Sequence, residues 1–258
     1  MKIIVRFIIS ILLISAASVL TADAQKFDRG LNYEKAPMFL PAGNLMIGGT
    51  ASYEQHGLQD FKFTMLSDIN VKGYALKATP YVYCTFYRNM ALGVRFSYKR
   101  TMADIKAAKI AINDDLQFEF DDIYAIQHTY YGSLSYRYYV PLFGSKVFAL
   151  FSDIGFSAGA GQGKILNKNG DFSDGTYQKI LDLSLEVTPG LIFFVANEMA
   201  IEASIQILRV GWKNVQQTSN QIYLGRYDGV GATFNINLLS INLGVDFVIP
   251  LGNKKITR

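Results

Sequence analysis

The chain has 258 residues and a formal net charge of +4 at pH 7, a near-neutral balance that gives no basic footprint and excludes nucleic acid as an expected partner. It contains one cysteine, Cys84, so no internal disulfide can hold the fold. The 16 Tyr, 18 Phe and 22 Gly, against 6 Pro, favour a β-protein with an aromatic surface and small residues in tight places.

The N-terminal segment has the three parts of a secretory signal peptide. Lys2 and Arg6 form a positive region, residues 7–20 form an apolar run, and small residues follow it. The residues expected at the cleavage point are Ala22, Ala24 and Gln25. A retained membrane anchor is the alternative, but the apolar run is at or below the ~17–25 residues of a spanning helix. We therefore predict export, with a signal peptide over 1–24.

Beyond residue 25, apolar and polar side chains alternate with period two in blocks, which is typical of β-strands with one apolar face. In the clearest block, 179–193, apolar side chains occupy odd positions, and Asp182, Ser184 and Glu186 occupy even ones. The candidate strands are 44–55, 73–86, 91–100, 127–140, 147–159, 178–194, 199–210 and 231–249.

Local irregularities are expected at three places. The apolar positions of the last block change from even to odd numbers, which predicts a bulge near Leu239 and Ser240. Pro80 and Pro189 fall inside candidate strands, where each removes a hydrogen-bond donor. We expect a bulge or a bend at each proline.

The connections between candidate strands alternate in length. The short ones are 87–90, 141–145 and 195–198, and the long, polar ones are 56–72, 101–126, 160–177 and 211–230. Short turns at one end and long loops at the other are typical of outer-membrane barrels, on the periplasmic and extracellular sides respectively.

The alternation alone does not say which face meets water, because a soluble barrel turns its apolar face inward and a membrane barrel turns it outward. The polar faces are rich in small residues, as a narrow interior requires, and the apolar faces are too large for an eight-stranded interior. Aromatic residues also gather at the short-turn ends, where an interfacial girdle is expected. They are Tyr81, Tyr83, Phe86, Tyr87, Tyr138, Tyr139, Phe143, Phe193 and Phe194.

The predicted fold class is therefore all-β, a single antiparallel up-and-down transmembrane β-barrel of about eight strands with short periplasmic turns and long extracellular loops. The predicted organisation is a signal peptide over 1–24, an N-terminal periplasmic lead segment over 25–43, the barrel over 44–250 and a periplasmic tail over 251–258.

Several stretches carry a family resemblance. They are 40–50 (LPAGNLMIGGT), 73–74 (GY), 80–83 (PYVY), 91–96 (ALGVRF), 136–142 (YRYYVPL) and 188–190 (TPG). With the strand order, they resemble the small outer-membrane β-barrel family, the OmpA/OmpX-like and PorT-like porin-family proteins. The resemblance implies a location in the cell outer membrane and an encounter with the barrel-assembly machinery during insertion. It implies architecture far more than function.

The inward face is expected to carry charges of both signs. They are Lys77, Arg95, Lys99, Arg137, Asp153, Asp182, Glu186, Glu202 and Asp246. Buried charges must pair, so a salt-bridged network that fills the interior is the first hypothesis. A gated or narrow pore lined by the same charges is the alternative.

The sequence offers no catalytic, metal or cofactor site. His56 and His128 are the two histidines, and neither lies in a pattern typical of a serine hydrolase. The paired aspartates Asp114-Asp115 and Asp121-Asp122 could bind a divalent cation, but solvated loop charge is the simpler interpretation. Cys84 shares an apolar face with its neighbours and is expected to be an inert lipid-facing thiol.

The functional hypothesis is a non-enzymatic outer-membrane barrel that stabilises the envelope or presents its loops for adhesion or interaction. Its expected partners are outer-membrane lipids, lipopolysaccharide, the assembly machinery and an unknown extracellular ligand. The alternatives are a narrow porin for small solutes and, third, a lipid-modifying enzyme.

Overall fold

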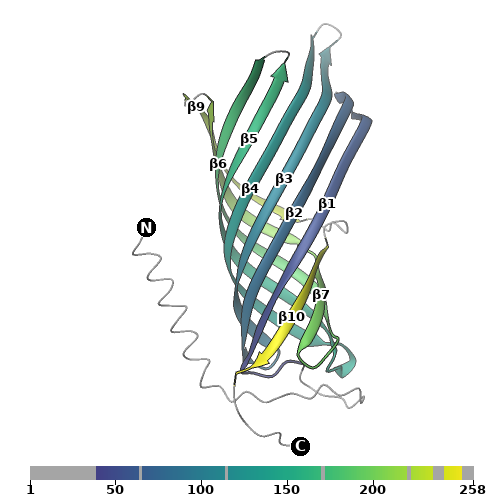
Figure 1. The fold of residues 1–258 in the computed structure, drawn as a ribbon, viewed down its shortest axis with the longest axis vertical. Helices are drawn as coiled ribbons and strands as arrows, with labels where there is room; N and C mark the ends of the chain where they lie inside the picture. Colours follow the sequence, from purple (N-terminus) through teal and green to yellow (C-terminus); the bar gives the residue numbers. More distant parts are fainter. Residues whose placement is uncertain are drawn as a thin grey trace, which may run out of the picture.

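The computed structural model describes residues 39–63, 66–113, 116–169, 172–219, 222–234 and 241–251, which form one antiparallel sheet (Figure 1). The strands are β1 (Asn44–Phe63), β2 (Leu66–Tyr87), β3 (Met90–Asn113), β4 (Leu116–Pro141), β5 (Phe148–Asn169), β6 (Phe172–Phe194), β7 (Met199–Ser204), β8 (Leu208–Ser219), β9 (Ile222–Phe234) and β10 (Asn242–Pro250), and a 3-10 turn, η1 (Leu142–Gly144), follows β4. In this part of the chain, no helix has the length and apolar character to cross a membrane.

The sheet closes into a ring. Each strand from β1 to β6 pairs with the next, β7 joins β6 to β10, and β10 pairs with β1. β8 continues along the same edge of β6 as β7, and it carries β9 on its other side. Around the ring of β1 to β7 and β10, each strand pairs on both sides, which an open sheet cannot do at its edges.

The described residues form ten strands, so the predicted count of about eight is wrong. The predicted seventh strand is divided into β7 and β8, and the predicted eighth into β9 and β10. The predicted bulge near Leu239 and Ser240 lies outside the described residues, between β9 and β10.

Pro189 explains the division of the seventh strand. The carbonyl of Pro189 accepts a hydrogen bond from the backbone N–H of Ile205 at 3.0 Å. The edge of β6 at Pro189 therefore faces the break at 205–207, and the proline has no N–H to donate there. The register changes by one residue across the break, because Gly190 pairs with Ser204 whereas Val187 pairs with Leu208. The irregularity expected at Pro189 thus occurs in the strand that faces it.

Of the bulge or bend expected at Pro80, the bulge is absent from the pairing of β2 with β3. The pairing of β2 with β3 passes from Ala78 opposite Tyr98 to Tyr81 opposite Arg95 without a change of register. Residues 79 and 80 have no partner in this ladder, and the pairing resumes at Tyr81 in the same register. The N–H that Pro80 lacks therefore interrupts the ladder over these two residues only.

The long connections predicted from the sequence are also wrong in their described parts, because they form strands. β1 and β2 continue to Phe63 and from Leu66, and β3 and β4 continue to Asn113 and from Leu116. The ladder is a backbone interaction, so it continues independently of the pattern of apolar and polar side chains.

The two faces of the ring differ in chemistry. On β6, Leu181, Leu183 and Leu185 are exposed on the outside, while Asp182 and Glu186 are buried inside. The same division is found around the ring, so the outer face is apolar and the inner face is polar over much of its height. This arrangement is the reverse of a soluble β-barrel.

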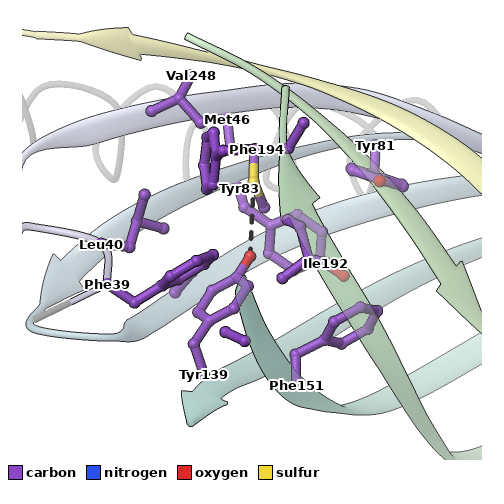
Figure 2. Packing of buried hydrophobic residues seen from close by; sticks show 13 residues of the cluster. Phe39, Leu40, Met46, Tyr81, Tyr83, Tyr139, Phe151, Ile192, Phe194 and Val248 are labelled. Carbon is purple, nitrogen blue, oxygen red and sulfur yellow. Dashed lines mark hydrogen bonds between the residues drawn. The ribbon is translucent and has the colours of Figure 1, made fainter. Parts of the chain in front are cut away.

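The interior at the short-turn end is apolar and closed (Figure 2). Its members are Phe39, Leu40, Met46, Tyr81, Tyr83, Ala91, Tyr139, Ala149, Phe151, Ile192, Phe194, Ala200 and Val248. The predicted outward girdle is therefore wrong for Tyr81, Tyr83, Tyr139 and Phe194, which point into the ring, whereas Phe86, Tyr87, Tyr138, Phe143 and Phe193 are exposed. We call the thirteen buried residues of this closed end, from Phe39 to Val248, the basal cluster.

Candidate functional site: a charge network and a cavity inside the ring

The nine charged residues predicted for the interior come from seven strands. Lys77 lies on β2, Arg95 and Lys99 on β3, Arg137 on β4, Asp153 on β5, Asp182 and Glu186 on β6, Glu202 on β7 and Asp246 on β10. The strand registers bring several of them side by side, since Arg137 stands directly opposite Asp153. The six residues Arg137, Asp153, Asp182, Glu186, Glu202 and Asp246 are buried.

Arg137 is the centre of a lower group directly above the basal cluster. Its guanidinium bonds Asp153 Oδ2 at 3.0 and 3.1 Å through Nη2 and Nε, and Glu202 Oε2 at 2.7 Å through Nη1. The hydroxyl of Tyr83 donates to the same Asp153 oxygen at 2.5 Å. One cation thus holds two carboxylates from different strands, β5 and β7, in the geometry that a forked guanidinium permits.

Aromatic rings surround this guanidinium. The carbon Cζ of Arg137 lies 4.5 Å from the ring centre of Tyr83, 5.1 Å from that of Tyr81 and 4.3 Å from that of Phe151. Tyr81 also donates to Asp246 Oδ1 at 2.7 Å. The faces of the rings attract the cation where little water reaches it, so the lower group is a dry, polar layer.

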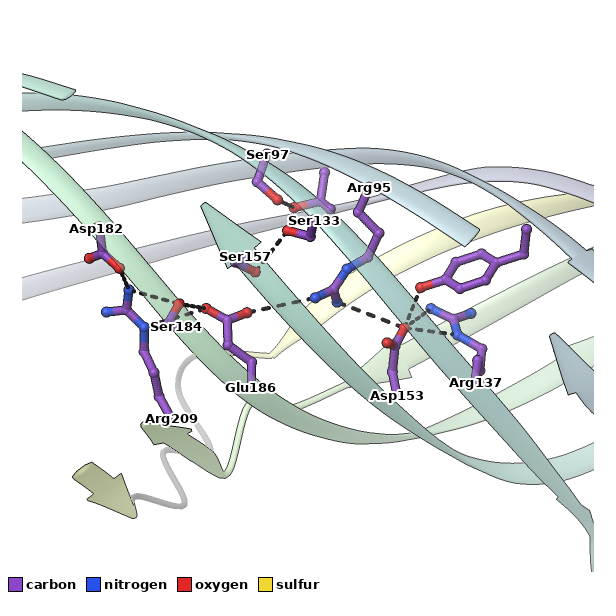
Figure 3. A network of polar contacts seen from close by, with 12 residues as sticks. Arg95, Ser97, Ser133, Arg137, Asp153, Ser157, Asp182, Ser184, Glu186 and Arg209 are labelled. Carbon is purple, nitrogen blue, oxygen red and sulfur yellow. Dashed lines mark hydrogen bonds and ion pairs between the residues drawn. The ribbon is translucent and has the colours of Figure 1, made fainter. Parts of the chain in front are cut away.

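Arg209 is the centre of an upper group, which Figure 3 shows beside the lower one. Its Nη2 bonds Asp182 Oδ1 at 2.5 Å and its Nε lies 3.4 Å from Glu186 Oε1. Arg95 lies between the groups, with Glu186 and Asp153 oxygens both at 3.7 Å. Three arginines and their carboxylates therefore form a continuous chain of ion pairs along the interior.

Three further residues belong to this network and are not among the predicted ones: Arg209, Tyr81 and Tyr83. Odd positions of β7 face outward, as Ile201 shows. If the strand continued without a break, Arg209 would also face outward. The extra residue at 205–207 reverses the phase, and Val210 is exposed instead. The apolar side chains Val210 and Trp212, at even positions, carried that signal in the sequence.

Lys77 and Lys99 lie beside the upper group. Both line a cavity of about 190 Å³ in the interior, with Arg209, Glu54 and Glu186. A space of about 20 Å³ lies next to it, lined by Lys77, Arg95 and Arg137 among others. The interior thus contains a polar hollow, then the lower group, then the basal cluster.

The chain segment that precedes β1 completes the closed end. Asn89 lies in the turn between β2 and β3 with φ 58°, and its Oδ1 accepts from the backbone N–H groups of Phe39 and Leu40 at 2.8 and 2.9 Å. Its own N–H donates to the carbonyl of Leu40 at 2.9 Å. The ring of Phe39 packs against those of Tyr139 and Phe194.

The remaining candidates do not form a reaction centre in the described residues. His128 Nδ1 lies 2.7 Å from the hydroxyl of Tyr98, and the two rings stack with their centres 6.0 Å apart. The side chain of His56 is outside the described residues, as are Asp114 and Asp115 and the side chains of Asp121 and Asp122. No group of three or more potential metal ligands occurs in the described part.

The signal-peptide prediction with Ala22, Ala24 and Gln25 also lies outside the described residues. Cys84 is a half-buried free thiol, on the same side of β2 as exposed Val82 and Phe86.

No protein-family model matches the chain, and no curated protein matches it. Among solved structures, the chain is similar to the crystal structure of Neisserial surface protein A, with 12% sequence identity and a TM-score of 0.34. The match covers 80% of this chain and 97% of that one.

Proposed function

We propose that this chain is an integral β-barrel of the cell outer membrane, closed to solutes and without catalytic activity. In this proposal, the barrel stabilises the envelope or presents its long hairpins to an extracellular ligand. The observation that carries the proposal is the reversed distribution of side chains, with leucines, valines and aromatic residues outside and paired charges inside.

The apolar residues on the outer surface support the proposal that lipid surrounds the barrel. Leu134 has 66% of its surface exposed, and it lies on the outer face of β4 between Tyr138 and Tyr130, both of which are also exposed. The distance along the strand between these tyrosines matches the ~9–11 residues with which a β-strand crosses a bilayer. A soluble protein rarely exposes an apolar patch larger than a few hundred Å².

The interior supports a barrel that does not conduct. The charges pair with one another, and the basal cluster fills the short-turn end. A porin keeps an aqueous path from one end to the other, so the narrow-porin alternative has less support than the closed barrel. The contact of His128 with Tyr98 gives no activated nucleophile, so the lipid-modifying enzyme remains third.

Cell fractionation with gel electrophoresis tests the proposal. We expect the protein in the outer-membrane fraction, where it migrates differently in denaturing gels before and after heating, because an unheated barrel stays folded. Recovery in the soluble periplasmic fraction would contradict the membrane proposal.

Planar-bilayer recording tests closure separately. The purified protein is expected to give no stable single-channel current, because the basal cluster blocks the path. A reproducible, charge-selective current would instead support the narrow porin.

A further inference from the structure

The outer face of β5 and β6 changes from apolar to polar towards the long hairpins. In that direction, the exposed side chains are Leu185, Leu183, Leu181 and Lys179 on β6, and Phe156, Ala158, Ala160, Gln162 and Lys164 on β5. The change occurs one outward position beyond Tyr130 on β4, because the register partner of Tyr130 on β5 is Ala160. The polar positions therefore lie at the edge of the apolar band, on the side of the hairpins.

Four polar side chains form a compact array at this edge. Gln162 is the register partner of Lys179, and Lys164 is the register partner of Tyr177. Partners on one face of an antiparallel pair have Cβ atoms about 4.5–5.5 Å apart, and diagonal neighbours are about 7–8 Å apart. The two lysines are diagonal neighbours, so both long side chains reach one shared ligand. We call these four side chains the outer array.

The positive charge of the outer array has no counter-charge on the same face. In the described side chains of β4, β5 and β6, the acids are Asp153, Asp182 and Glu186. All three are buried inside the ring. The positions that flank the array are His128 and Ile126 on β4, and Gln216 and Thr218 on β8. Within the described residues, neither Lys164 nor Lys179 forms a salt bridge.

We propose that this face of the barrel binds a lipid with a phosphomonoester headgroup, whose phosphate lies between Lys164 and Lys179. The inference rests on the proposed membrane location. A phosphate accepts charge-assisted hydrogen bonds from both ammonium groups, and Gln162 and Tyr177 supply further donors. A phosphomonoester carries a charge of about −1.5 to −2 at pH 7, which matches two lysines better than the single charge of a phosphodiester does.

The apolar surface below the outer array favours a lipid over a soluble phosphate. A headgroup at the array brings the acyl chains over Leu181 and Leu183, on the side of the bilayer core. On β5, Ala160 stands between the larger Tyr130 and Leu181, so its small side chain leaves room for a methylene chain. An added methyl group at Gly132, opposite Ala158 on β4, would meet no atom within 4 Å. A free phosphate ion would use the array and gain nothing from this surface.

Native mass spectrometry of the purified protein in a maltoside detergent tests the proposal. The probes are diphosphoryl lipid A, which is a phosphomonoester glycolipid, phosphatidylglycerol, which is a phosphodiester, and inorganic phosphate. We expect lipid A to bind, phosphatidylglycerol to bind more weakly and inorganic phosphate to leave bound lipid A in place. Lys164→Met and Lys179→Met are each expected to weaken lipid A binding about tenfold, as the loss of a charge-assisted hydrogen bond implies.

Two further variants make the test specific to the outer array. Lys72→Met is the matched control, because Lys72 is an exposed lysine on β2 whose register partner on β3 is the acid Asp104. It is expected to leave the affinity unchanged. Lys179→Arg keeps the charge and the donors and is expected to keep the binding. Migration in unheated gels checks that each variant is folded, and substitutions at exposed positions of this kind leave a fold intact.

The outcomes separate this inference from the proposed function. Absence of lipid A binding overturns the inference, as does equal binding by the wild type and the two methionine variants. An equal loss in Lys72→Met also overturns it, because the attraction would then belong to the whole cationic surface. Equal binding of phosphatidylglycerol, or displacement of lipid A by inorganic phosphate, contradicts a phosphomonoester lipid as the ligand. Recovery in the soluble periplasmic fraction contradicts both proposals, whereas an outer-membrane protein that binds no lipid A contradicts this one alone.

Discussion

At the level of single residues, Arg137 is the position on which the most buried contacts converge. Replacing it with Met leaves Glu202 buried without the arginine that bonds it, and leaves Asp153 with Arg95 alone at 3.7 Å. Breaking a buried ion pair in this way costs about 3–5 kcal/mol. We expect Arg137→Met to lower the free energy of unfolding by that amount, measured by urea titration of the folded gel band.

Two comparisons make this test specific. Arg88→Met removes an exposed arginine and is expected to change stability by less than about 0.5 kcal/mol. The double variant Arg137→Met with Asp153→Asn is expected to recover part of the loss, because one uncompensated charge is gone. Equal stability of Arg137→Met and the wild type would show that the lower group does not hold the ring.

Asn89 is the second residue with a separable role. Its side chain holds Phe39 and Leu40 in the basal cluster through two backbone N–H groups. Asn89→Ala is expected to speed hydrogen exchange of these two amides by roughly tenfold or more, as the loss of about 1–3 kcal/mol for unsatisfied donors implies. Asn89→Asp keeps the acceptor and should keep the protection. Unchanged exchange in Asn89→Ala would contradict this role.

At the level of the strands, Leu134 on β4 distinguishes lipid from water outside the ring. In a bilayer, Leu134→Arg is expected to cost about 2–4 kcal/mol, because the charge would lie near the midplane. An exposed position in water would tolerate the same change within about 0.5 kcal/mol. The free energy of unfolding in lipid vesicles measures the difference. Ile126→Arg is the control, because Ile126 lies beyond Tyr130 on the same strand, and we expect it to have a smaller effect.

Strand positions were predictable from the sequence only where one face is apolar. The alternation in residues 179–193 identified the outer face of β6 and the buried charges Asp182 and Glu186 together. The predicted strands stop short of the outer ends of β1 to β4, where the backbone ladder continues. The alternation of apolar and polar residues reflects the surroundings of the side chains, whereas the hydrogen bonds of the ladder are made by the backbone.

The inner-face position of several charged residues could be predicted from the sequence, whereas the part that Arg209 plays in the network could not. Lys77, Arg95 and Lys99 could be placed on the inner face by counting, but counting cannot say which carboxylate each one meets. Tyr81 and Tyr83 were assigned to an outward girdle because aromatic composition at a turn is the same for either face. Both lie on β2 in the same phase as Lys77, so the counting that places Lys77 on the inner face also places these tyrosines there.

At the level of the whole molecule, the two ends of the ring are expected to face opposite sides of the membrane. In a Cys84→Ser background, Lys106→Cys places a thiol at an exposed position toward the long hairpins, and Arg88→Cys places one in a short turn. A membrane-impermeant maleimide should label the first in intact cells and the second only after the outer membrane is permeabilised. The reverse pattern would invert the proposed orientation.

The seam between the first and last strands has a consequence for how the molecule forms. β1 and β10 share eight register pairs, from Asn44 with Pro250 to Ala51 with Leu243, whereas β5 and β6 share twenty-two. The seam also joins residues from opposite ends of the sequence, so its loop-closure entropy is the largest in the ring. We infer that this seam closes last in folding.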